Sequence, residues 1–309
     1  MNYIPFGVQE REVSRIILGL MRIASMRVPE AVSLVEGALD AGINALDTAD
    51  IYADGKCEEI LGDAFASRPG LRDKCFLQTK CGIRKDPDFT WFDFSKEHIV
   101  EAAERSLKRL RTDHVDCLLL HRPDALMEAE EIAEAFEILH RSGKVLNFGV
   151  SNMNPGMIEW LKTELPFPIC ANQVQLSCAF TPSLDAAFHV NMKDDAAVMR
   201  DGGILKYCRM NRIVIQAWSS LQYGYFEGVF LGSEKYPKLN QVIARIAAER
   251  EVSNSAVALA WILRLPGRMQ AVIGTTKLSR VCDAAQACEI VLSRKEWYEI
   301  YLAAGNTLP

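Results

Sequence analysis

Eight short apolar runs, each followed by a longer segment, constrain the fold of this chain more than any other feature of its sequence. The runs cover residues 15–20, 43–46, 75–79, 115–120, 145–150, 169–174, 213–217 and 270–273. Such alternation with helix-like segments is typical of βα units that build a parallel sheet. Because eight units can close a parallel sheet on itself, the pattern predicts an α/β protein with a (β/α)8 TIM barrel.

The segments between the runs repeat apolar residues every three or four positions, as amphipathic helices do. One segment has them at Ile99, Ala102, Ala103, Leu107 and Leu110, and the next at Ile132, Ala135, Phe136 and Leu139. Pro29 and Glu30 stand at positions that helix starts favour, and Gly143 stands where helices commonly end. Each of these helices is expected to cover the sheet.

The 309 residues contain no tract rich in proline, glycine or serine that could serve as a linker, so we expect one domain over residues 1–309. Three pieces fall outside the eight units. They are a hairpin arm over residues 2–13, a helix near residues 253–263 and a final helix over about residues 294–304. The expected fold is therefore a barrel with an N-terminal hairpin arm and extra C-terminal helices.

Charge and composition exclude several classes of partner. The formal net charge is −5 and no segment concentrates lysine or arginine, which argues against nucleic acid. No run of about 18 apolar residues occurs and the first residues lack a secretory pattern, so we expect no membrane partner and a cytoplasmic location. The nine cysteines include no Cys-x-x-Cys pair, so neither a disulfide framework nor a metal site is expected. A small-molecule partner fits best.

Ionisable side chains stand directly behind the second, third and fourth runs. They are Asp47, Lys80 and His121, and Tyr52 lies a few residues past Asp47. In a parallel barrel every strand points the same way, so residues after the strands converge on one rim, where barrel enzymes have their active sites. Neighbouring strands are about 4.8 Å apart, so these four side chains are expected to lie close together.

An aspartate, a tyrosine, a lysine and a histidine at one rim suggest a phenol whose proton is made available. Unperturbed tyrosine has a pKa of about 10, which is too high for efficient proton exchange near neutrality. A nearby ammonium stabilises the phenolate, so we expect Lys80 to lower the pKa of Tyr52 while Asp47 holds Lys80 in place. His121 would donate a hydrogen bond to a substrate oxygen or relay a proton.

Six stretches resemble the successive signatures of the aldo-keto reductase superfamily. In chain order they are GINALDTADIYADGKCEEILGDAF, LQTKCG, SLKRLRTDHVDCLLLHRPD, GKVLNFGVSN, NQVQLS and IGTTKLSR. The resemblance implies a (β/α)8 barrel that binds NADPH across its rim and reduces aldehydes or ketones to alcohols by hydride transfer, without a metal. Asp47, Tyr52, Lys80 and His121 fall on the four catalytic positions of that family, with Tyr52 as the general acid.

The same resemblance implies a set of cofactor contacts. Those around the nicotinamide and pyrophosphate are Ser151, Asn152 and Gln173 for the carboxamide, Trp218 for the ring, and Ser219 and Leu221 for the pyrophosphate. The others are Met21, Arg22, Asp47, Gly274, Thr275, Thr276, Lys277 and Arg280. Arg280 would hold the 2′-phosphate that distinguishes NADPH from NADH. The chain departs from many members by having Gly274 where a lysine is common and Ala284 where an asparagine would contact adenine.

Two classes of function fit these residues. The first is an NADPH-dependent carbonyl reductase, expected as a monomer, that acts on a small carbonyl substrate. The alternative is a nucleotide-binding regulatory subunit similar to the β subunits of potassium channels, in which the four catalytic positions can persist. Because the chain stops soon after the expected final helix, we also expect an open pocket with broad substrate tolerance.

Overall fold

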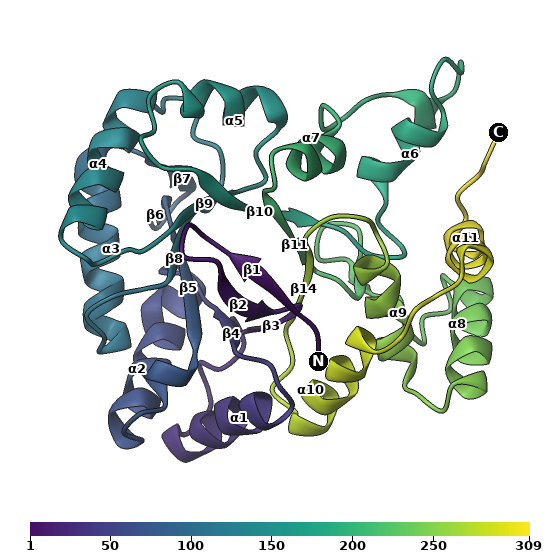
Figure 1. The fold of residues 1–309 in the computed structure, drawn as a ribbon, viewed down its shortest axis with the longest axis horizontal. Helices are drawn as coiled ribbons and strands as arrows, with labels where there is room; N and C mark the ends of the chain where they lie inside the picture. Colours follow the sequence, from purple (N-terminus) through teal and green to yellow (C-terminus); the bar gives the residue numbers. More distant parts are fainter.

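The computed structural model describes residues 1–309 and has a closed barrel of eight parallel strands. In barrel order the strands are β3 (Ile16–Gly19), β4 (Ala45–Asp47), β5 (Phe76–Cys81), β8 (Cys117–Leu120), β9 (Phe148–Ser151), β10 (Ile169–Gln175), β11 (Val214–Trp218) and β14 (Met269–Ile273). β14 pairs with β3 and closes the ring. Figure 1 looks along the barrel, whose strands lie inside a set of helices. The predicted (β/α)8 barrel is confirmed.

Several strands extend further toward the rim than the apolar runs predict. Asp47, Lys80 and Trp218 belong to β4, β5 and β11, although the predicted runs end just before each of them. A parallel ladder is made by main-chain groups, so a polar side chain at the end of a strand does not interrupt it. Asp47 is paired with Gln78 and Lys80 with Leu119 in the sheet. The sheet backbone therefore holds these side chains more firmly than a loop would.

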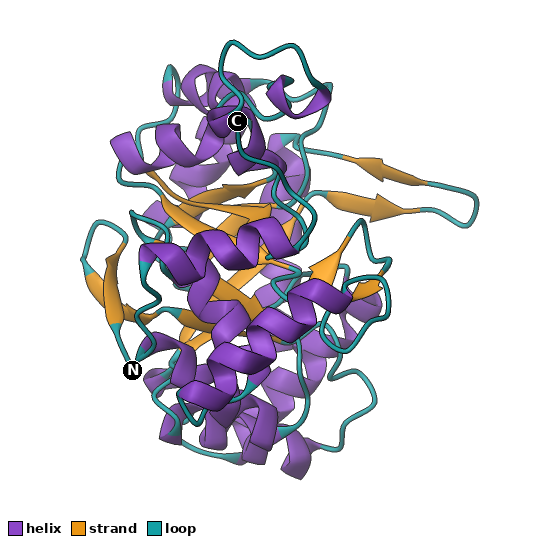
Figure 2. Cartoon of the chain, turned by 90° about the vertical axis from the view of Figure 1, so that its right-hand side faces the viewer, coloured by secondary structure: helices purple, strands orange, loops and turns teal.

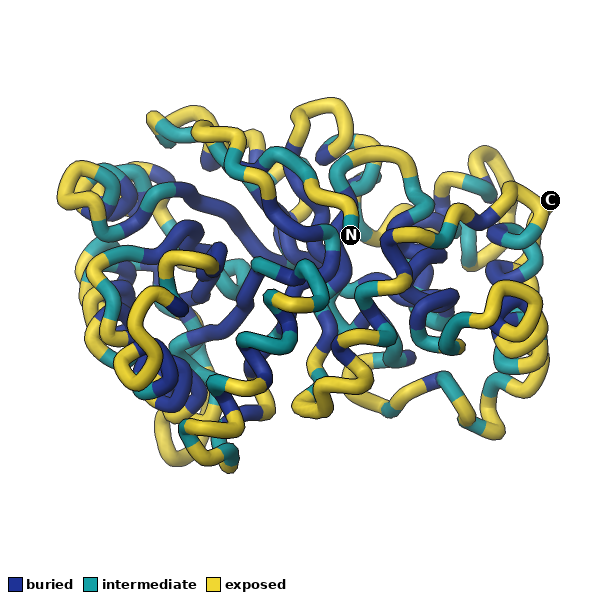
Figure 3. The backbone as a smooth tube through the Cα atoms, turned by 60° about the horizontal axis from the view of Figure 1, so that its bottom comes forward, coloured by how far each residue is buried: buried dark blue, intermediate teal, exposed yellow.

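Helices cover the outside of the barrel. They are α1 (Val28–Asp40), α2 (Lys56–Ser67), α3 (Lys96–Leu110), α4 (Ala129–Arg141), α5 (Pro155–Lys162), α7 (Ile204–Met210), α9 (Asn254–Leu263) and α10 (Leu278–Ala285). The apolar stripes predicted for α3 and α4 face inward, and Ile99, Leu107 and Phe136 are buried. Figure 3 shows the same division for the whole chain, with buried backbone inside and exposed turns outside.

Helix boundaries follow the predicted signals. α1 has Pro29 in its first turn, and the Glu30 carboxylate accepts a hydrogen bond from the backbone N–H of Arg27 (2.9 Å). α4 ends at Arg141, and Gly143 then adopts a φ of 71° while its N–H bonds to the carbonyl of His140 (2.9 Å). Glycine tolerates this left-handed conformation, which turns the chain away from the helix toward β9.

Two further helices form an outer layer beyond α9. They are α8 (Pro237–Glu249) and α11 (Arg294–Ala303), which stand together at the right of Figure 1. Trp261 of α9 and Trp297 of α11 stack with ring centroids 4.7 Å apart, and each indole N–H donates to the other residue's carbonyl at 3.0 Å. The predicted helices near residues 253–263 and 294–304 are confirmed, whereas α8 and α6 (Pro182–Phe188) were not predicted.

Short elements complete the fold. They are the strand pairs β6 (Ile83–Lys85) with β7 (Thr90–Phe92) and β12 (Gln222–Tyr223) with β13 (Gly228–Val229), and the 3-10 turns η1 (Tyr52–Gly55), η2 (Arg72–Lys74), η3 (Asp195–Ala197) and η4 (Gln286–Cys288). Pieces this short show no recognisable period in a sequence, so none was predicted. None of the helices combines the length and apolar character that a bilayer span requires.

An antiparallel hairpin closes the amino-terminal end of the barrel, where the sequence predicted a hairpin arm. It consists of β1 (Tyr3–Phe6) and β2 (Arg11–Ser14) and crosses in front of the barrel strands in Figure 1. In the side view of Figure 2 it lies next to the N terminus. Phe6 is fully buried against Phe76 of β5, with ring centroids 4.7 Å apart, and Val13 belongs to the same apolar cluster.

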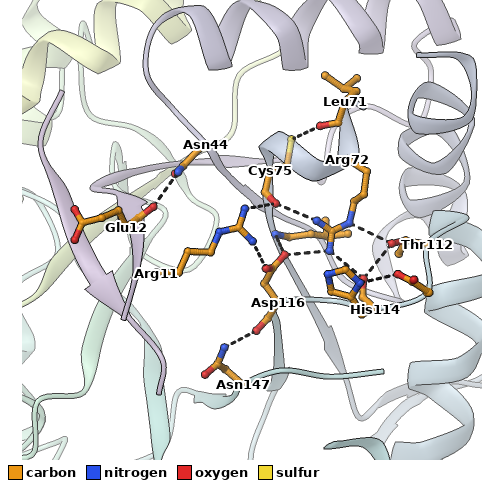
Figure 4. A network of polar contacts seen from close by, with 12 residues as sticks. Arg11, Glu12, Asn44, Leu71, Arg72, Cys75, Thr112, His114, Asp116 and Asn147 are labelled. Carbon is orange, nitrogen blue, oxygen red and sulfur yellow. Dashed lines mark hydrogen bonds and ion pairs between the residues drawn. The ribbon is translucent and has the colours of Figure 1, made fainter. Parts of the chain in front are cut away.

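A buried carboxylate ties this hairpin to the barrel (Figure 4). Asp116, just before β8, forms ion pairs with Arg11 of β2 and with Arg72 (Nη2 to Oδ2, 3.0 Å). It also accepts a hydrogen bond from the backbone N–H of Leu77 (2.8 Å). Both arginines donate to the carbonyl of Cys75 at 3.0 Å. The cluster therefore fixes the hairpin against the beginnings of β5 and β8.

Candidate active site

Lys80 is the centre of a polar cluster at the carboxyl-terminal rim. Its ammonium lies 2.6 Å from Asp47 Oδ2, 2.8 Å from the carbonyl of Thr48 and 3.2 Å from the phenol oxygen of Tyr52. The side chains of Lys80 and Asp47 are only 0% and 3% exposed. A lysine ammonium has three N–H donors. The three contacts use all of them, so the buried charge is fully satisfied.

Tyr52 reaches Lys80 because the chain turns sharply behind it. In η1, Ala53 and Asp54 adopt φ values of 50° and 54°, and Gly55 adopts 89°. A Cβ atom on Gly55 would also lie 2.8 Å from the side chain of Arg109, so glycine is required there on two grounds. The turn folds the phenol back over the end of β5, as the sequence predicted.

The ionisation of this cluster differs from the sequence-based expectation in one respect. Burial raises the pKa of Tyr52 by more than the neighbouring Lys80 lowers it, so the expected lowered pKa is wrong. Burial acts to lower the pKa of Lys80, but Asp47 and Tyr52 outweigh it and the pKa is raised. The structure thus holds a charged ammonium beside a phenol that keeps its proton at neutral pH.

His121 completes the cluster. Its backbone N–H bonds to the carbonyl of Cys81 (2.9 Å), and its ring meets the Tyr52 ring edge-on with centroids 5.9 Å apart. Burial, Lys80 and Arg122 together hold the pKa of His121 well below its usual range, so the ring is neutral. Its Nδ1 is buried without a partner, which leaves Nε2 as the nitrogen that can bind a ligand. A neutral ring is suited to donating a hydrogen bond.

Four residues predicted to contact a nicotinamide are linked to one another across neighbouring strands. Trp218 Nε1 donates to Asn152 Oδ1 (3.1 Å), and Asn152 Nδ2 donates to Ser151 Oγ (2.8 Å). Ser151 Oγ in turn donates to the carbonyl of Gln173 (2.9 Å). Asn152 has a φ of 57°, a conformation that asparagine tolerates better than most residues. The structure therefore brings together Ser151, Asn152, Gln173 and Trp218.

The residues predicted to bind the rest of a dinucleotide lie along the same rim. Ser219 has a φ of 50°, and its hydroxyl donates to Gln222 Oε1 (2.8 Å). Arg22 Nη1 donates to the carbonyl of Gly274 (3.2 Å), which joins the exits of β3 and β14. The others follow one of these strands, namely Met21, Leu221, Thr275, Thr276, Lys277 and Arg280. Lys277 caps α10, and Arg280 is exposed in its first turn.

Comparison with known proteins identifies the family. The Aldo/keto reductase family model matches residues 15–302. The chain belongs to the aldo/keto reductase family. It is 35% identical to the oxidoreductase YdhF of Escherichia coli over 99% of both chains, and 35% identical to a 6-dehydroglucose reductase of Agrobacterium fabrum over 96% of both. An aldo-keto reductase of Klebsiella pneumoniae solved in complex with NADPH superposes with a TM-score of 0.77 at 25% identity, covering 99% of this chain and 96% of that one.

One residue at the rim of this aldo/keto reductase was not predicted from the sequence. Arg122 follows His121, and its guanidinium carbon lies 5.4 Å from the centre of the Trp218 ring and 5.8 Å from that of Tyr225. Its side chain makes no hydrogen bond or ion pair within the protein, so its N–H donors remain free for a ligand. Its position directly after a strand exit was the signal that could have identified it.

Three glutamines of the barrel interior were also missed, because they stand inside apolar runs. They are Gln78, Gln216 and Gln270, and all three are buried. Gln173, predicted to bind a carboxamide, joins them, since its amide nitrogen contacts both Asp47 Oδ1 and Gln216 Oε1 at 3.1 Å. A polar residue inside a predicted strand is the signal that could have revealed this group.

Proposed function

We propose that this aldo/keto reductase uses NADPH to reduce an aldehyde or ketone to the alcohol, with Tyr52 as the proton donor. The observation that carries the proposal is the contact of one buried ammonium, that of Lys80, with both Asp47 and Tyr52. The NADPH complex of the Klebsiella pneumoniae relative supports the choice of cofactor.

The residues at the rim fit a phosphorylated dinucleotide. Lys277 and Arg280 are exposed near the start of α10 and form no ion pair, so both charges are free for a phosphate. The unbonded N–H groups of a helix start also favour an anion. Trp218 is partly exposed and has its indole N–H fixed by Asn152, which supports stacking of a flat ring on its face. When bound, NADPH supplies the hydride that adds to the carbonyl carbon.

Proton delivery follows from the hydrogen bonds around Tyr52. As the carbonyl carbon gains the hydride, its oxygen becomes an alkoxide and takes the phenol proton of Tyr52. Lys80, 3.2 Å from the phenol oxygen, stabilises the phenolate that remains. His121, neutral and edge-on to Tyr52, donates a hydrogen bond to the same substrate oxygen and orients it. The raised pKa of Tyr52 keeps the phenol protonated at neutral pH, so the proton is present when the alkoxide forms.

The substrate class that we propose is a small aldehyde carrying several hydroxyl groups. The free guanidinium of Arg122 beside Trp218 supplies donors for such hydroxyls, and the aromatic face packs against the C–H face of a sugar-like ring. The relative named 6-dehydroglucose reductase supports this class. Hydroxylated aldehydes should therefore have a higher kcat/KM than apolar aldehydes of the same size. Arg122→Met should abolish this preference, and an unchanged preference would refute the role of Arg122.

Substitution of the phenol tests the reaction itself. Tyr52→Phe should lower kcat by about 10²–10⁴-fold, the usual contribution of a general acid, and should leave NADPH affinity within about twofold. NADPH oxidation and fluorescence titration of the cofactor measure the two quantities. If Tyr52→Phe reduced aldehydes at the wild-type rate, Tyr52 would not be the acid.

A further inference from the structure

Four buried glutamines form a continuous hydrogen-bonded group inside the barrel. They are Gln78 of β5, Gln173 of β10, Gln216 of β11 and Gln270 of β14, and none is more than 3% exposed. Barrel interiors are normally filled by branched apolar side chains. Amides in this position are costly unless every one of them is hydrogen-bonded. The group therefore needs an explanation beyond packing.

The upper end of the group meets the catalytic carboxylate. Gln78 Nε2 donates to Asp47 Oδ1 at 2.6 Å, and Gln173 Nε2 donates to the same oxygen at 3.1 Å. The other oxygen, Oδ2, accepts from Lys80 at 2.6 Å. The two oxygens of Asp47 thus have separate tasks, since one is held by amides and the other binds the ammonium.

The other end of the group, where Gln270 contacts Ser14, fixes the orientation of these amides. Gln78 and Gln216 form a reciprocal pair, with nitrogen-to-oxygen distances of 2.9 and 3.0 Å. Gln216 Nε2 also donates to Gln270 Oε1 (3.1 Å), and Gln270 Nε2 donates to the backbone carbonyl of Ser14 (2.8 Å). A backbone carbonyl only accepts hydrogen bonds, and so does an ionised carboxylate. With an acceptor at each end, the group must present N–H donors to Asp47.

The sheet register makes this arrangement possible. Asp47 is paired with Gln78 between β4 and β5, and Gln216 is paired with both Gln173 and Gln270 on its two sides. The glutamines therefore project into the interior at matching heights on their strands. Because the backbone ladder sets these heights, the amides need no loop to hold them in place.

We propose that Gln78 and Gln173 are positioning residues that hold the Asp47 carboxylate turned so that Oδ2 faces Lys80. The inference rests on the proposed reduction reaction, because Lys80 must be charged to stabilise the Tyr52 phenolate. Without the two amides, Oδ1 would be buried without a partner, and the carboxylate could turn away from Lys80. A carboxylate that has turned away could no longer hold the Lys80 ammonium beside Tyr52.

The first test compares substitutions at the two ends of the group. Gln78→Met keeps the side-chain length but removes a donor to Asp47, whereas Gln270→Met removes the same chemical group where it contacts no catalytic residue. For Gln78→Met we expect kcat to fall about tenfold while the KM for NADPH stays nearly unchanged. For Gln270→Met we expect a lower Tm but a kcat near that of the wild type. Equal losses of kcat in both variants would overturn the inference.

A second measurement needs no turnover, so it separates failure of this inference from failure of the proposed function. Crystal structures of the wild type and of Gln78→Met are compared for the orientation of the Asp47 carboxylate. In Gln78→Met, Oδ2 should lie farther from Lys80 Nζ than the 2.6 Å of the wild type. Gln78→Asn keeps an amide but withdraws it from Asp47, and it serves the same test if the methionine variant does not fold. An unchanged carboxylate orientation in the variant would refute the positioning role.

Discussion

The two ends of the barrel each contain a buried carboxylate paired with basic side chains, yet the two clusters are built differently. At the amino-terminal end Asp116 binds two arginines, and these also donate to main-chain carbonyls such as that of Cys75. At the carboxyl-terminal end Asp47 binds one lysine, whose remaining contacts include the phenol of Tyr52. The first cluster joins segments of chain, while the second joins a charge to a phenol.

The choice of cation explains this difference. Arginine has a planar fork of donors that can bind a carboxylate and carbonyls at once, which suits a junction between chain segments. Lysine is a compact charge with three donors, and at Lys80 one of these is directed at a single phenol. Barrel enzymes generally keep catalysis at the carboxyl-terminal face and stability at the opposite face. The two clusters show that a buried carboxylate can serve either end of the barrel, depending on the cation that it binds.

Removal of the lysine charge should have the largest effect. Lys80→Met should lower kcat by about 10²–10⁴-fold, because the Tyr52 phenolate loses its stabilising charge. It should also cost about 3–5 kcal/mol of unfolding free energy, because Asp47 is left buried without a cation. Steady-state turnover and urea unfolding measure the two effects. The double variant Asp47→Asn with Lys80→Met should recover stability without recovering turnover, and recovery of both would contradict this account.

Neutralising Asp116 should lower stability and leave turnover nearly unchanged. Asp116→Asn should lower the unfolding free energy by about 2–4 kcal/mol, because two arginines lose their charged partner. The loss is smaller than for Lys80 since the Arg11 side chain is 37% exposed and can be hydrated. Turnover measured well below the melting temperature should stay within about twofold of the wild type, because no catalytic group is touched. A drop in kcat comparable to that of Lys80→Met would erase the distinction between the two ends.

The half-buried carboxylate of Asp50, which has no direct cation contact, should show the smallest effect and a distinct pH dependence. Burial raises the pKa of Asp50 to about 7, and the nearby Glu58 adds to the shift. Between about pH 4 and 7 the folded state keeps a proton that the unfolded state has lost, so wild-type stability falls as pH rises through this window. Asp50→Asn should therefore be more stable by about 1–3 kcal/mol at pH 8 and should match the wild type near pH 4. Thermal unfolding of both proteins at the two pH values tests this prediction. A stability difference that does not vary with pH would refute the raised pKa of Asp50.

The sequence predicted the barrel and the polar cluster at its carboxyl-terminal rim because both depend on local patterns. The apolar runs give the strands, and Asp47, Lys80 and His121 each stand at the end of one. Tyr52 was placed correctly for the same reason. The pKa of Tyr52 was predicted wrongly, because the depth of burial depends on the whole surrounding structure. Burial raises this pKa by more than Lys80 lowers it.

Long-range partnerships were beyond the sequence. Gln78 and Gln216 are hydrogen-bonded partners, but 138 positions separate them in the chain. Each alone looks like an isolated polar residue in an apolar strand. Arg122 likewise lies over the rings of Trp218 and Tyr225, two residues that come much later in the sequence. The partners of such residues become visible only when strand order and register are known.

The hairpin that closes the amino-terminal end has a consequence for folding during synthesis. Its residues are made before their partners, because Phe6 packs on Phe76, Arg11 binds Asp116, and the N–H of Val8 bonds to Asn147 Oδ1 at 3.1 Å. The apolar side chains of the hairpin therefore stay uncovered on the ribosome until these later segments have been translated. The hairpin can dock only after the strands that it closes have emerged.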